Sequence, residues 1–331
     1  MFKGHALLQS PDGTWERVGW SRVTVKEDGL HPLFEGTFSI ARDHHHVKLR
    51  SNYMRTKRHY DEHAAEKARE YMVVFRDSDI DQGLDSDYRR SLPMGKSCGA
   101  DNLQFNVDPN HPIFNSASRP DTSRWNAMSL ESIFGLTKRQ DDLAGDGGGR
   151  SGGGNLRATI GSTAGCPSTK KVALVGVATD CEYFKLYDSE QAVRENIIKV
   201  VNDASEIYES SFNITLGLRN LTVVDGNCPS SPSTKTPWNA DCSSGKDMQD
   251  RLNLFSDWRG KQGDVNAFWT LMTKCATGSE VGLAWLGQLC VSSATGDGSS
   301  NQGDNNTTGS SQSVSGASVV AYTPSEWQVF A

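Results

Sequence analysis

A chain of 331 residues, of which 36% are apolar, is long enough to form two domains with hydrophobic cores. Its 34 Lys and Arg residues against 40 Asp and Glu residues give a formal net charge of -6, without a long basic run. Because phosphate groups are bound by clustered Lys and Arg, this balance argues against a nucleic-acid partner. No apolar stretch approaches the roughly 18 residues that span a membrane, and the first residues lack the apolar core of a signal peptide.

The N-terminal part of the chain is expected to be rich in β-strands. Residues 15–25 and 33–40 alternate between apolar and polar side chains with the period of a half-buried strand. The run 46–49 continues this alternation, and 71–75 is apolar enough for a buried strand. From residue 76 to 136 the chain carries many turn-forming residues and is expected to be irregular.

Composition changes near residue 145, where a glycine-rich segment begins. All eight histidines precede residue 112, and the glycine triplets 147–149 and 152–154 predict a flexible linker. The dibasic pair Lys138-Arg139 just before it is a candidate site for a processing protease, because such enzymes cut exposed, unstructured chain. An ordinary solvated pair is the alternative. We therefore expect an N-terminal region at 1–139, a linker at 140–165 and a second region at 166–331.

After the linker, strands alternate with helices. The run 171–178 is typical of a central strand, and 188–208 places its apolar residues on one helical face after the capping pair Asp188 and Gln191. The remaining expected elements are strands at 214–224, 265–272, 282–286 and 318–322, helices beginning near residues 247 and 324, and a long loop at 292–316. The fold class is therefore α+β and α/β, with a β-rich region followed by a mixed sheet and helices.

Cysteines and sequons indicate an oxidising, secretory compartment. Six of the seven cysteines follow residue 165, and their spacings match neither a zinc ribbon nor a redox motif. The N-x-[ST] sequons in the same half are Asn213, Asn220, Asn305 and Asn306. Both features favour structural disulfides and glycans, so we expect that a signal peptide is missing from the start of this sequence. The disulfide pairing stays open, with Cys228 and Cys242 favoured because they close a short loop.

Other residue patterns give no active site. His44 and His46 would share one face of a strand, but spacing places no further ligand nearby, and a solvated strand end is the favoured interpretation of 44–46. The acidic run 77–87 resembles a calcium loop but lacks the Gly and Glu that an EF-hand needs. No G-x-S-x-G motif and no phosphate-binding loop is present, and a histidine-ligated zinc site cannot be built within 112–331.

Cys98 is the only cysteine of the N-terminal part and lies in the irregular segment. An odd cysteine in a secreted chain indicates a reactive or metal-binding thiol, and a thiolate is a strong zinc ligand. A simple free thiol is the alternative, and the residues alone do not decide between the two.

The order of elements in residues 166–331 resembles the reprolysin (adamalysin, ADAM-type) zinc metalloproteases, most closely their fungal members. The segments that carry the resemblance are 171–178, 188–208, 213–216, 282–287 with Cys290, and 318–331, which looks like the strand and helix that precede the family's zinc motif. The N-terminal part looks like the matching prodomain, through 34–38 and 71–79. The resemblance implies a β-rich prodomain followed by a metzincin-like mixed sheet that is incomplete at its C-terminus.

For individual residues the resemblance implies specific roles. Cys98 is similar to the cysteine switch, whose thiolate fills the open coordination position of zinc and keeps the zymogen inactive. Lys138-Arg139 becomes the activation cleavage site. Gly282, Leu283 and Ala284 match the edge strand on which an extended substrate pairs. The implied protein is secreted or at the cell surface, and its partners are peptide or protein substrates.

The catalytic signature of that family, H-E-x-x-H-x-x-G-x-x-H, is absent from these 331 residues. In the family its histidines hold zinc and its glutamate is the general base. The resemblance therefore implies a fragment of a zinc metalloendopeptidase precursor, with no zinc at a catalytic site and no proteolysis expected of this chain alone. A non-catalytic extracellular peptide- or protein-binding remnant is the alternative, and an intracellular scaffold would require the clustered cysteines to stay reduced.

Overall fold

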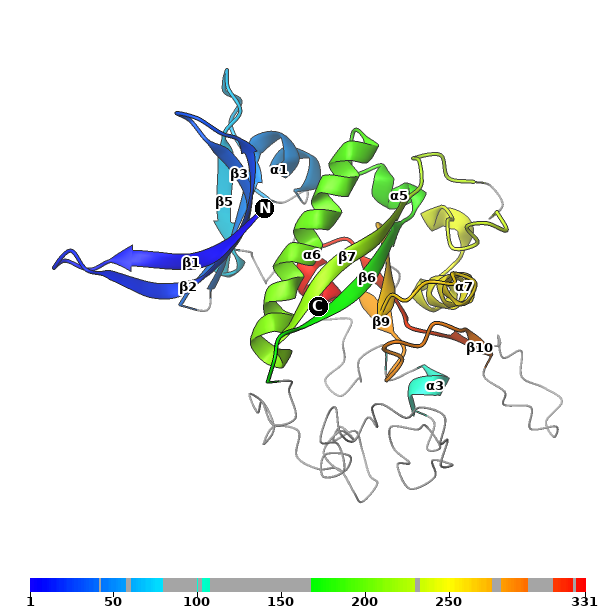
Figure 1. Ribbon diagram of the computed structural model, residues 1–331. Helices are drawn as coiled ribbons and strands as arrows, with labels where there is room; N and C mark the ends of the chain where they lie inside the picture. The colour runs from blue at the N-terminus through cyan, green and yellow to red at the C-terminus, as the bar shows by residue number, and fades with distance from the viewer. Residues whose placement is uncertain are drawn as a thin grey trace, which may run out of the picture.

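The computed structural model describes residues 1–41, 43–57, 61–79, 100, 103–107, 168–229, 233–275, 281–296, 312–323 and 326–331. Two five-stranded sheets dominate the described residues, one in each half of the chain (Figure 1). No helix among them combines the length and apolar character that crossing a membrane requires. The mixture of an antiparallel sheet and a mixed, helix-covered sheet confirms the expected α/β character.

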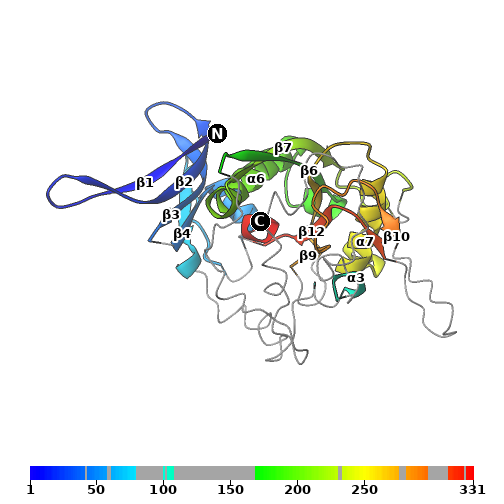
Figure 2. The same ribbon diagram turned by 60° about the horizontal axis from the view of Figure 1, so that its bottom comes forward.

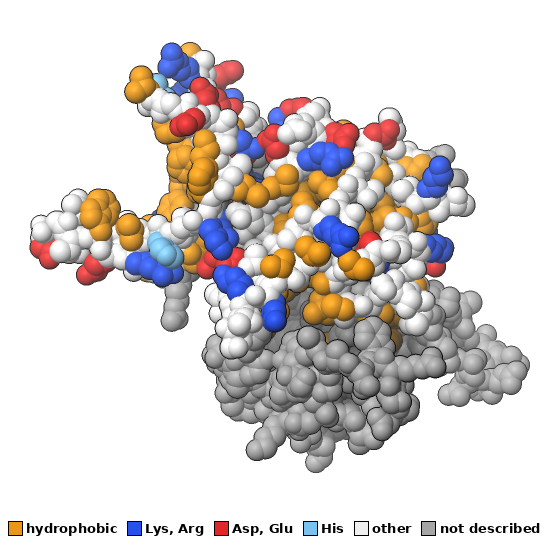
Figure 3. All heavy atoms as spheres, in the orientation of Figure 1, with side chains coloured by type: hydrophobic (Ala, Val, Ile, Leu, Met, Phe, Trp, Pro, Cys, Tyr) orange, Lys and Arg blue, Asp and Glu red, His pale blue; other side chains and the backbone are white. Residues whose placement is uncertain are grey.

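The N-terminal sheet is an antiparallel meander in the order β1-β2-β3-β4-β5. Its strands are β1 (Phe2–Gln9), β2 (Trp15–Glu27), β3 (Leu33–Ile40), β4 (Asp43–Leu49) and β5 (Met72–Arg76), with helix α1 (Arg50–Thr56) and the 3₁₀ helix η1 (Asp77–Asp79). The β1–β2 hairpin extends away from the rest of the molecule (Figure 1). Hydrophobic side chains are visible on this sheet (Figure 3), and Leu7 and Trp15 are 50% and 62% exposed, so the hairpin buries little apolar surface.

The second sheet has the order β7-β6-β8-β12-β9, in which β9 runs antiparallel to β12 and the other neighbours pair in parallel. Its strands are β6 (Lys171–Thr179), β7 (Ile214–Val223), β8 (Phe268–Thr273), β9 (Gly282–Ala284) and β12 (Ala317–Ala321). A separate short ladder joins β10 (Thr295–Gly296) to β11 (Ser313–Val314). The expected strands of this half are therefore confirmed, with small differences in their ends.

Helices cover both faces of the second sheet (Figure 2). They are α5 (Cys181–Phe184), α6 (Glu190–Phe212), the 3₁₀ helix η7 (Cys242–Ser244), α7 (Met248–Gly260) and α8 (Glu326–Phe330), and the N-terminal half adds α3 (Gln104–Val107). Helix α6 ends at Asn213, which adopts the left-handed conformation with φ 56° that closes many helices. The Ser189 side chain accepts from the Ala192 N–H and begins the helix, so the expected capping pair beginning at Asp188 is wrong.

Two hydrophobic clusters form the core, one on each face of the second sheet. Phe255 of α7 belongs to the first cluster, and Ile197 of α6 belongs to the second. The neighbouring β12 residues Val319 and Val320 enter different clusters, because successive side chains of a strand point to opposite faces. Each such fully buried apolar side chain contributes about 1.5–3 kcal/mol to stability.

The N-terminal sheet packs on α6, on the face of the second sheet opposite α7 (Figure 2). The Thr37 hydroxyl on β3 donates to Asp203 Oδ2 at 2.9 Å, and both residues are 0% exposed. Lys199, one turn before Asp203, lies 3.0 Å from the same oxygen. Burial raises the pKa of Asp203, and the Lys199 charge opposes that increase. The contact between the two halves therefore includes buried charged groups that hydrogen bonds stabilise.

The structure corrects the interpretation of His44 to His46 as a solvated strand end. His46 is only 2% exposed, and its Nε2 lies 2.6 Å from Asp77 Oδ1. His44 Nδ1 lies 3.0 Å from the other oxygen of the same carboxylate. The two imidazoles share one face of β4, as the alternation predicts, but they contact the same carboxylate, and His46 is buried. Burial lowers the pKa of His46, although the hydrogen bond to Asp77 opposes this.

The disulfides also differ from the expected pair. Cys228 is bonded to Cys181 and Cys242 to Cys275, so the favoured pairing of Cys228 with Cys242 is wrong. Each disulfide connects the end of a strand or helix to a loop that is distant in sequence. The length of the loop between two cysteines does not predict such a pairing. Among the described residues Cys290 is free and exposed.

Candidate substrate-binding edge

Strand β9 forms one edge of the second sheet, as the sequence predicts for Gly282, Leu283 and Ala284. Leu283 lies opposite Val319 of β12, and the Ala321 N–H donates to the Val281 carbonyl at 2.8 Å. Hydrogen-bonded pairs alternate along an antiparallel ladder. Leu283 therefore directs its backbone groups to β12, whereas Gly282 and Ala284 direct theirs away from the sheet. This outer side is where an added strand could pair.

Packing fixes the position of β9 and of the residues that follow it. Leu283 is 6% exposed within the cluster under α7, and the Trp285 indole N–H donates to Ser256 Oγ of α7 at 2.7 Å. A Cβ on Gly282 would come within 3.0 Å of Val329 Cγ1, so a larger residue would crowd α8. The edge strand is thus held by α7 on one face and is close to α8 on the other.

A cavity of about 490 Å³ lies beside this edge. Leu283, Val320, Phe268 and Phe330 are among its lining residues, and so is Ala100 from the N-terminal half. Most of these side chains are apolar, as in many binding sites for hydrophobic groups. The edge strand is therefore bordered by a cavity that suits apolar side chains.

Residues from the N-terminal half lie against β9. Asn106 Nδ2 donates to the Ala284 carbonyl at 3.1 Å, and Asn106 Oδ1 accepts from the Leu286 N–H at 2.8 Å. Leu103 is 1% exposed and belongs to the cluster under α7. The Phe105 ring packs edge-on against Trp285, with 5.9 Å between the ring centroids. A segment far away in the sequence thus covers part of the outer side of the edge.

Comparisons with known proteins identify the family of the second half of the chain. A reprolysin-type family model described as "Metallo-peptidase family M12" matches residues 168–331. A disintegrin and metalloproteinase domain-containing protein B from Aspergillus fumigatus is 51% identical over 335 residues, which cover 100% of this chain. Relatives with the same name from Trichophyton verrucosum and Arthroderma benhamiae are 43% identical over 337 residues and also cover 100% of it. Residues 168–331 belong to the M12 metallopeptidase family. The chain spans 41% of the length of each of these relatives.

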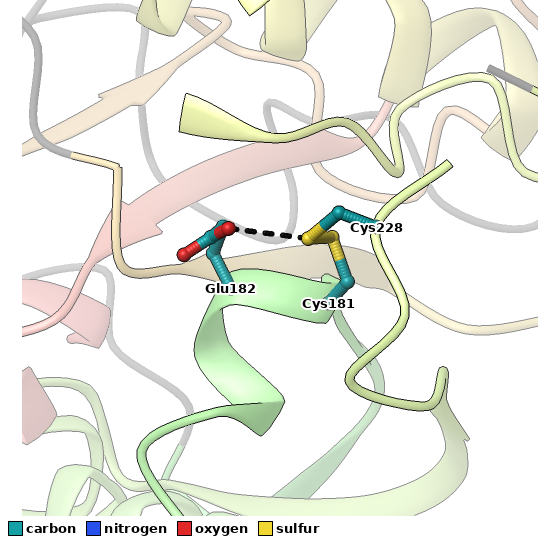
Figure 4. A group of neighbouring side chains, drawn as sticks. All are labelled: Cys181, Glu182 and Cys228. Atoms are coloured by element: carbon teal, nitrogen blue, oxygen red, sulfur yellow. Dashed lines mark hydrogen bonds between the residues drawn. A yellow bond between two sulfur atoms is a disulfide. The ribbon is translucent and has the colours of Figure 1, made fainter. Parts of the chain in front are cut away.

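The M12 metallopeptidases are zinc-dependent, so the side chains that could bind a metal ion are of interest. Among the described residues, Cys181, Glu182 and Cys228 form the one group with ligand atoms all within 4.8 Å of one another. The two sulfurs are joined in a disulfide, and the Glu182 carboxylate lies beside them (Figure 4). Disulfide sulfurs carry no thiolate charge, whereas zinc needs deprotonated ligands. These three side chains therefore do not form a zinc-binding site.

A buried ion pair lies next to this disulfide. Arg251 Nη1 of α7 lies 3.1 Å from Asp180 Oδ2 at the start of α5, and both residues are 0% exposed. The Arg251 guanidinium also donates to the Ala240 and Asp241 carbonyls. Burial raises the pKa of Asp180 to about 6, although hydrogen bonds and the Arg251 charge oppose the increase. We assign this ion pair a structural role, because its polar atoms are directed at the protein interior.

Several of the predicted site residues lie outside the residues that the structure describes. They are Cys98, Lys138, Arg139, Asn305 and Asn306. Two sequon asparagines are described, and both are half-buried. Asn213 closes α6, and Asn220 Oδ1 on β7 accepts from Asn266 Nδ2 at 2.9 Å. Glycosylation of these residues remains a prediction.

Sequence reasoning did not identify Asn106. It lies in a region whose turn-forming composition predicted irregular chain, and no periodic pattern distinguishes it from neighbouring polar residues. Its hydrogen bonds join residues 178 and 180 positions apart along the chain. Such contacts arise from tertiary docking, which a single sequence does not display.

Proposed function

We propose that this chain provides the prodomain and the substrate-binding sheet of a secreted or cell-surface zinc metalloendopeptidase that hydrolyses internal peptide bonds. The observation that carries the proposal is the edge strand β9 in a domain of the M12 family, with the backbone groups of Gly282 and Ala284 directed outward. An extended peptide can pair with such an edge, and the adjacent apolar cavity can accept its side chains.

Residues 1–139 act in this proposal as the prodomain, followed by a linker at 140–165 and the family domain from 166. The docking of β2 and β3 on α6 supports a role as a folding and latency module. Cys98 serves as the thiol that keeps the zymogen inactive, and cleavage after Lys138-Arg139 begins activation. Asn213, Asn220, Asn305 and Asn306 serve as glycan acceptors.

In this proposal the ligands of the catalytic zinc do not come from the residues of this chain. No histidine follows His111 in the sequence, and the described group of possible ligands contains a disulfide. Because the chain spans 41% of the length of its relatives, we assign the zinc ligands to a part of the protein that these residues do not include. The 331 residues alone are expected to cleave no peptide.

Peptide cleavage tests the proposal. The protein expressed from its complete reading frame, then cut by a dibasic-specific protease, should hydrolyse internal bonds of a denatured protein. A zinc chelator should abolish this activity, and added zinc should restore it. The 331-residue chain, treated in the same way, should be inactive. Absence of cleavage by the complete protein, or cleavage that the chelator leaves unchanged, would contradict the assignment.

A non-catalytic peptide-binding protein is the second candidate, favoured by the absence of H-E-x-x-H from these residues. The same experiment separates the two functions. A binding protein would retain a labelled extended peptide on β9 without cutting it, whatever the chelator concentration. Cleavage by the complete protein would exclude this candidate.

A further inference from the structure

We propose that Asn106 is a latch residue, whose side-chain amide occupies the Ala284 carbonyl of the edge strand and the Leu286 N–H just beyond it, two outward backbone groups that an extended substrate would otherwise meet. The inference rests on the proposed role of β9 as the substrate-binding edge. It assigns a second inhibitory contact to the N-terminal half, separate from the Cys98 thiol. The partner on the outer side of β9 in this state is a segment of the same chain, of which Ala100 and residues 103–107 are described.

The Asn106 amide offers the edge strand one donor and one acceptor, as the backbone of a paired strand would. Nδ2 donates to the Ala284 carbonyl at 3.1 Å, and Oδ1 accepts from the Leu286 N–H at 2.8 Å. An added strand would satisfy an edge strand through the same kinds of bond, with one acceptor and one donor at neighbouring positions. A peptide cannot pair with these two groups while the amide is bound to them.

The amide is held in one orientation. Its second Nδ2 hydrogen donates to the Ala100 carbonyl at 2.9 Å, and the Asn106 N–H donates to the Leu103 carbonyl at 2.9 Å. If the amide oxygen and nitrogen exchanged places, the amide oxygen would face the carbonyl oxygens of Ala100 and Ala284, and neither could donate a hydrogen bond to it. Because Asn106 is 8% exposed, water has little access to replace these bonds. The loss of the amide is therefore costly at this buried position.

The neighbouring residues bring Asn106 to the edge. Leu103 is buried among the side chains under α7, and Phe105 packs against Trp285, the residue between the two groups that Asn106 binds. The Phe105 N–H donates to Gln312 Oε1 at 2.9 Å, which attaches the segment to the residue just before β11. These contacts are apolar or involve neutral groups, so neither salt nor zinc is needed for the segment to dock.

Hydrogen exchange of the 331-residue chain tests the contact without any peptidase activity. Asn106→Ala should raise the exchange rate of the Leu286 amide by about tenfold, because its buried acceptor is lost. Amides of β6 and β8 should keep their exchange rates. Asn52→Ala is the matched control, since Asn52 Nδ2 donates to Glu35 within the N-terminal half at 2.9 Å. Equal Leu286 exchange in both variants would overturn the proposal, and so would a uniform increase across β6 and β8.

A peptide in trans tests the inhibitory role even if the Asn106→Ala chain does not fold. A synthetic peptide of residues 99–108, which lacks the Cys98 thiol, should inhibit the activated complete protein. The same peptide with Ala in place of Asn106 should inhibit about tenfold more weakly. Equal inhibition by the two peptides would overturn the latch. If the complete protein cleaves nothing, the proposed function fails, while the exchange result still decides whether Asn106 covers the edge.

Discussion

Arg22 and Glu206 form an ion pair between the two halves of the chain. The Arg22 guanidinium on β2 donates to Glu206 Oε2 on α6 through Nη2 at 2.6 Å and through Nε at 3.2 Å. Arg22 is 4% exposed, and its Nη2 also lies 3.3 Å from Glu209. One N-terminal cation thus balances two carboxylates of α6. Removing it would leave both carboxylates near the interface without this partner.

Arg22→Ala is expected to lower the free energy of unfolding by about 1–3 kcal/mol, between the values for exposed and for fully buried ion pairs. Urea unfolding followed by tryptophan fluorescence measures the change. Arg17→Ala, an exposed arginine on the same strand, is the control and should stay within about 0.5 kcal/mol of the parent chain. Equal midpoints for the two variants would show that the ion pair does not stabilise the interface.

Stability should fall at acidic pH partly because of Glu209. Burial favours a higher pKa, but the hydrogen bond from Lys170 and the charges of Arg22 and Lys3 outweigh it and lower the pKa from 4.5 to about 2. The folded state therefore binds this proton less readily than the unfolded state. The resulting stability is present above pH 4.5 and is lost as the pH falls toward 2.

The free energy of unfolding measured between pH 6 and pH 2 checks this effect. Glu209→Gln should show a flatter pH dependence than the parent chain, because its side chain no longer titrates. Glu27→Gln, which changes an exposed carboxylate on β2, is the control variant. A Glu209→Gln curve parallel to that of the parent chain would contradict the assigned pKa.

Arg251→Met should destabilise the family domain by about 3–5 kcal/mol, because it leaves the buried Asp180 carboxylate and two carbonyls without their donor. Thermal unfolding followed by circular dichroism measures the loss. Arg219→Ala, an exposed arginine on β7, should change little. The prediction is wrong if both variants melt at the same temperature.

Peptide mapping without reductant should find the pairs Cys181–Cys228 and Cys242–Cys275. Cys290, which is exposed, should react with an alkylating reagent in the native chain. A fragment that joins Cys228 to Cys242 would contradict the structure. Removing the Cys242–Cys275 bond, with both cysteines replaced by serine, should cost about 2–4 kcal/mol.

Local patterns in the sequence predict most of the strands. The alternation in 33–40 and the apolar run 171–178 correspond to β3 and β6, since both depend only on neighbouring residues. Strand β1 was missed because its residues are mostly exposed and show no alternation of burial. Pairing with β2, and not burial, holds it in place. The family resemblance predicted an edge strand at 282–284, and β9 is the last strand in the order of the second sheet. Its role in binding a substrate stays a prediction.

Long-range contacts account for what the sequence does not reveal. His46 is buried beside the carboxylate of Asp77, which follows β5. Nothing in the run 44–46 predicts this contact. Cys181 and Cys228 pair because β6 and the segment after β7 end close together. Asn106 reaches the edge strand because the neighbouring Leu103 and Phe105 pack against the family domain. Each of these contacts depends on the docking of segments that are distant in sequence.

The contacts between the N-terminal half and the family domain include Arg22 and Thr37 on α6 and, at a separate position, Asn106 on β9. Both contacts involve residues before 108, whereas the family match begins at residue 168. A backbone cut between these positions breaks the covalent connection and leaves both contacts intact. Each contact keeps the other at a high effective concentration, so the cut pieces separate only when both open together. In the zymogen proposed above, latency would therefore outlast the cut, and dilution or further proteolysis of residues 1–107 would set the rate at which the proposed activity emerges.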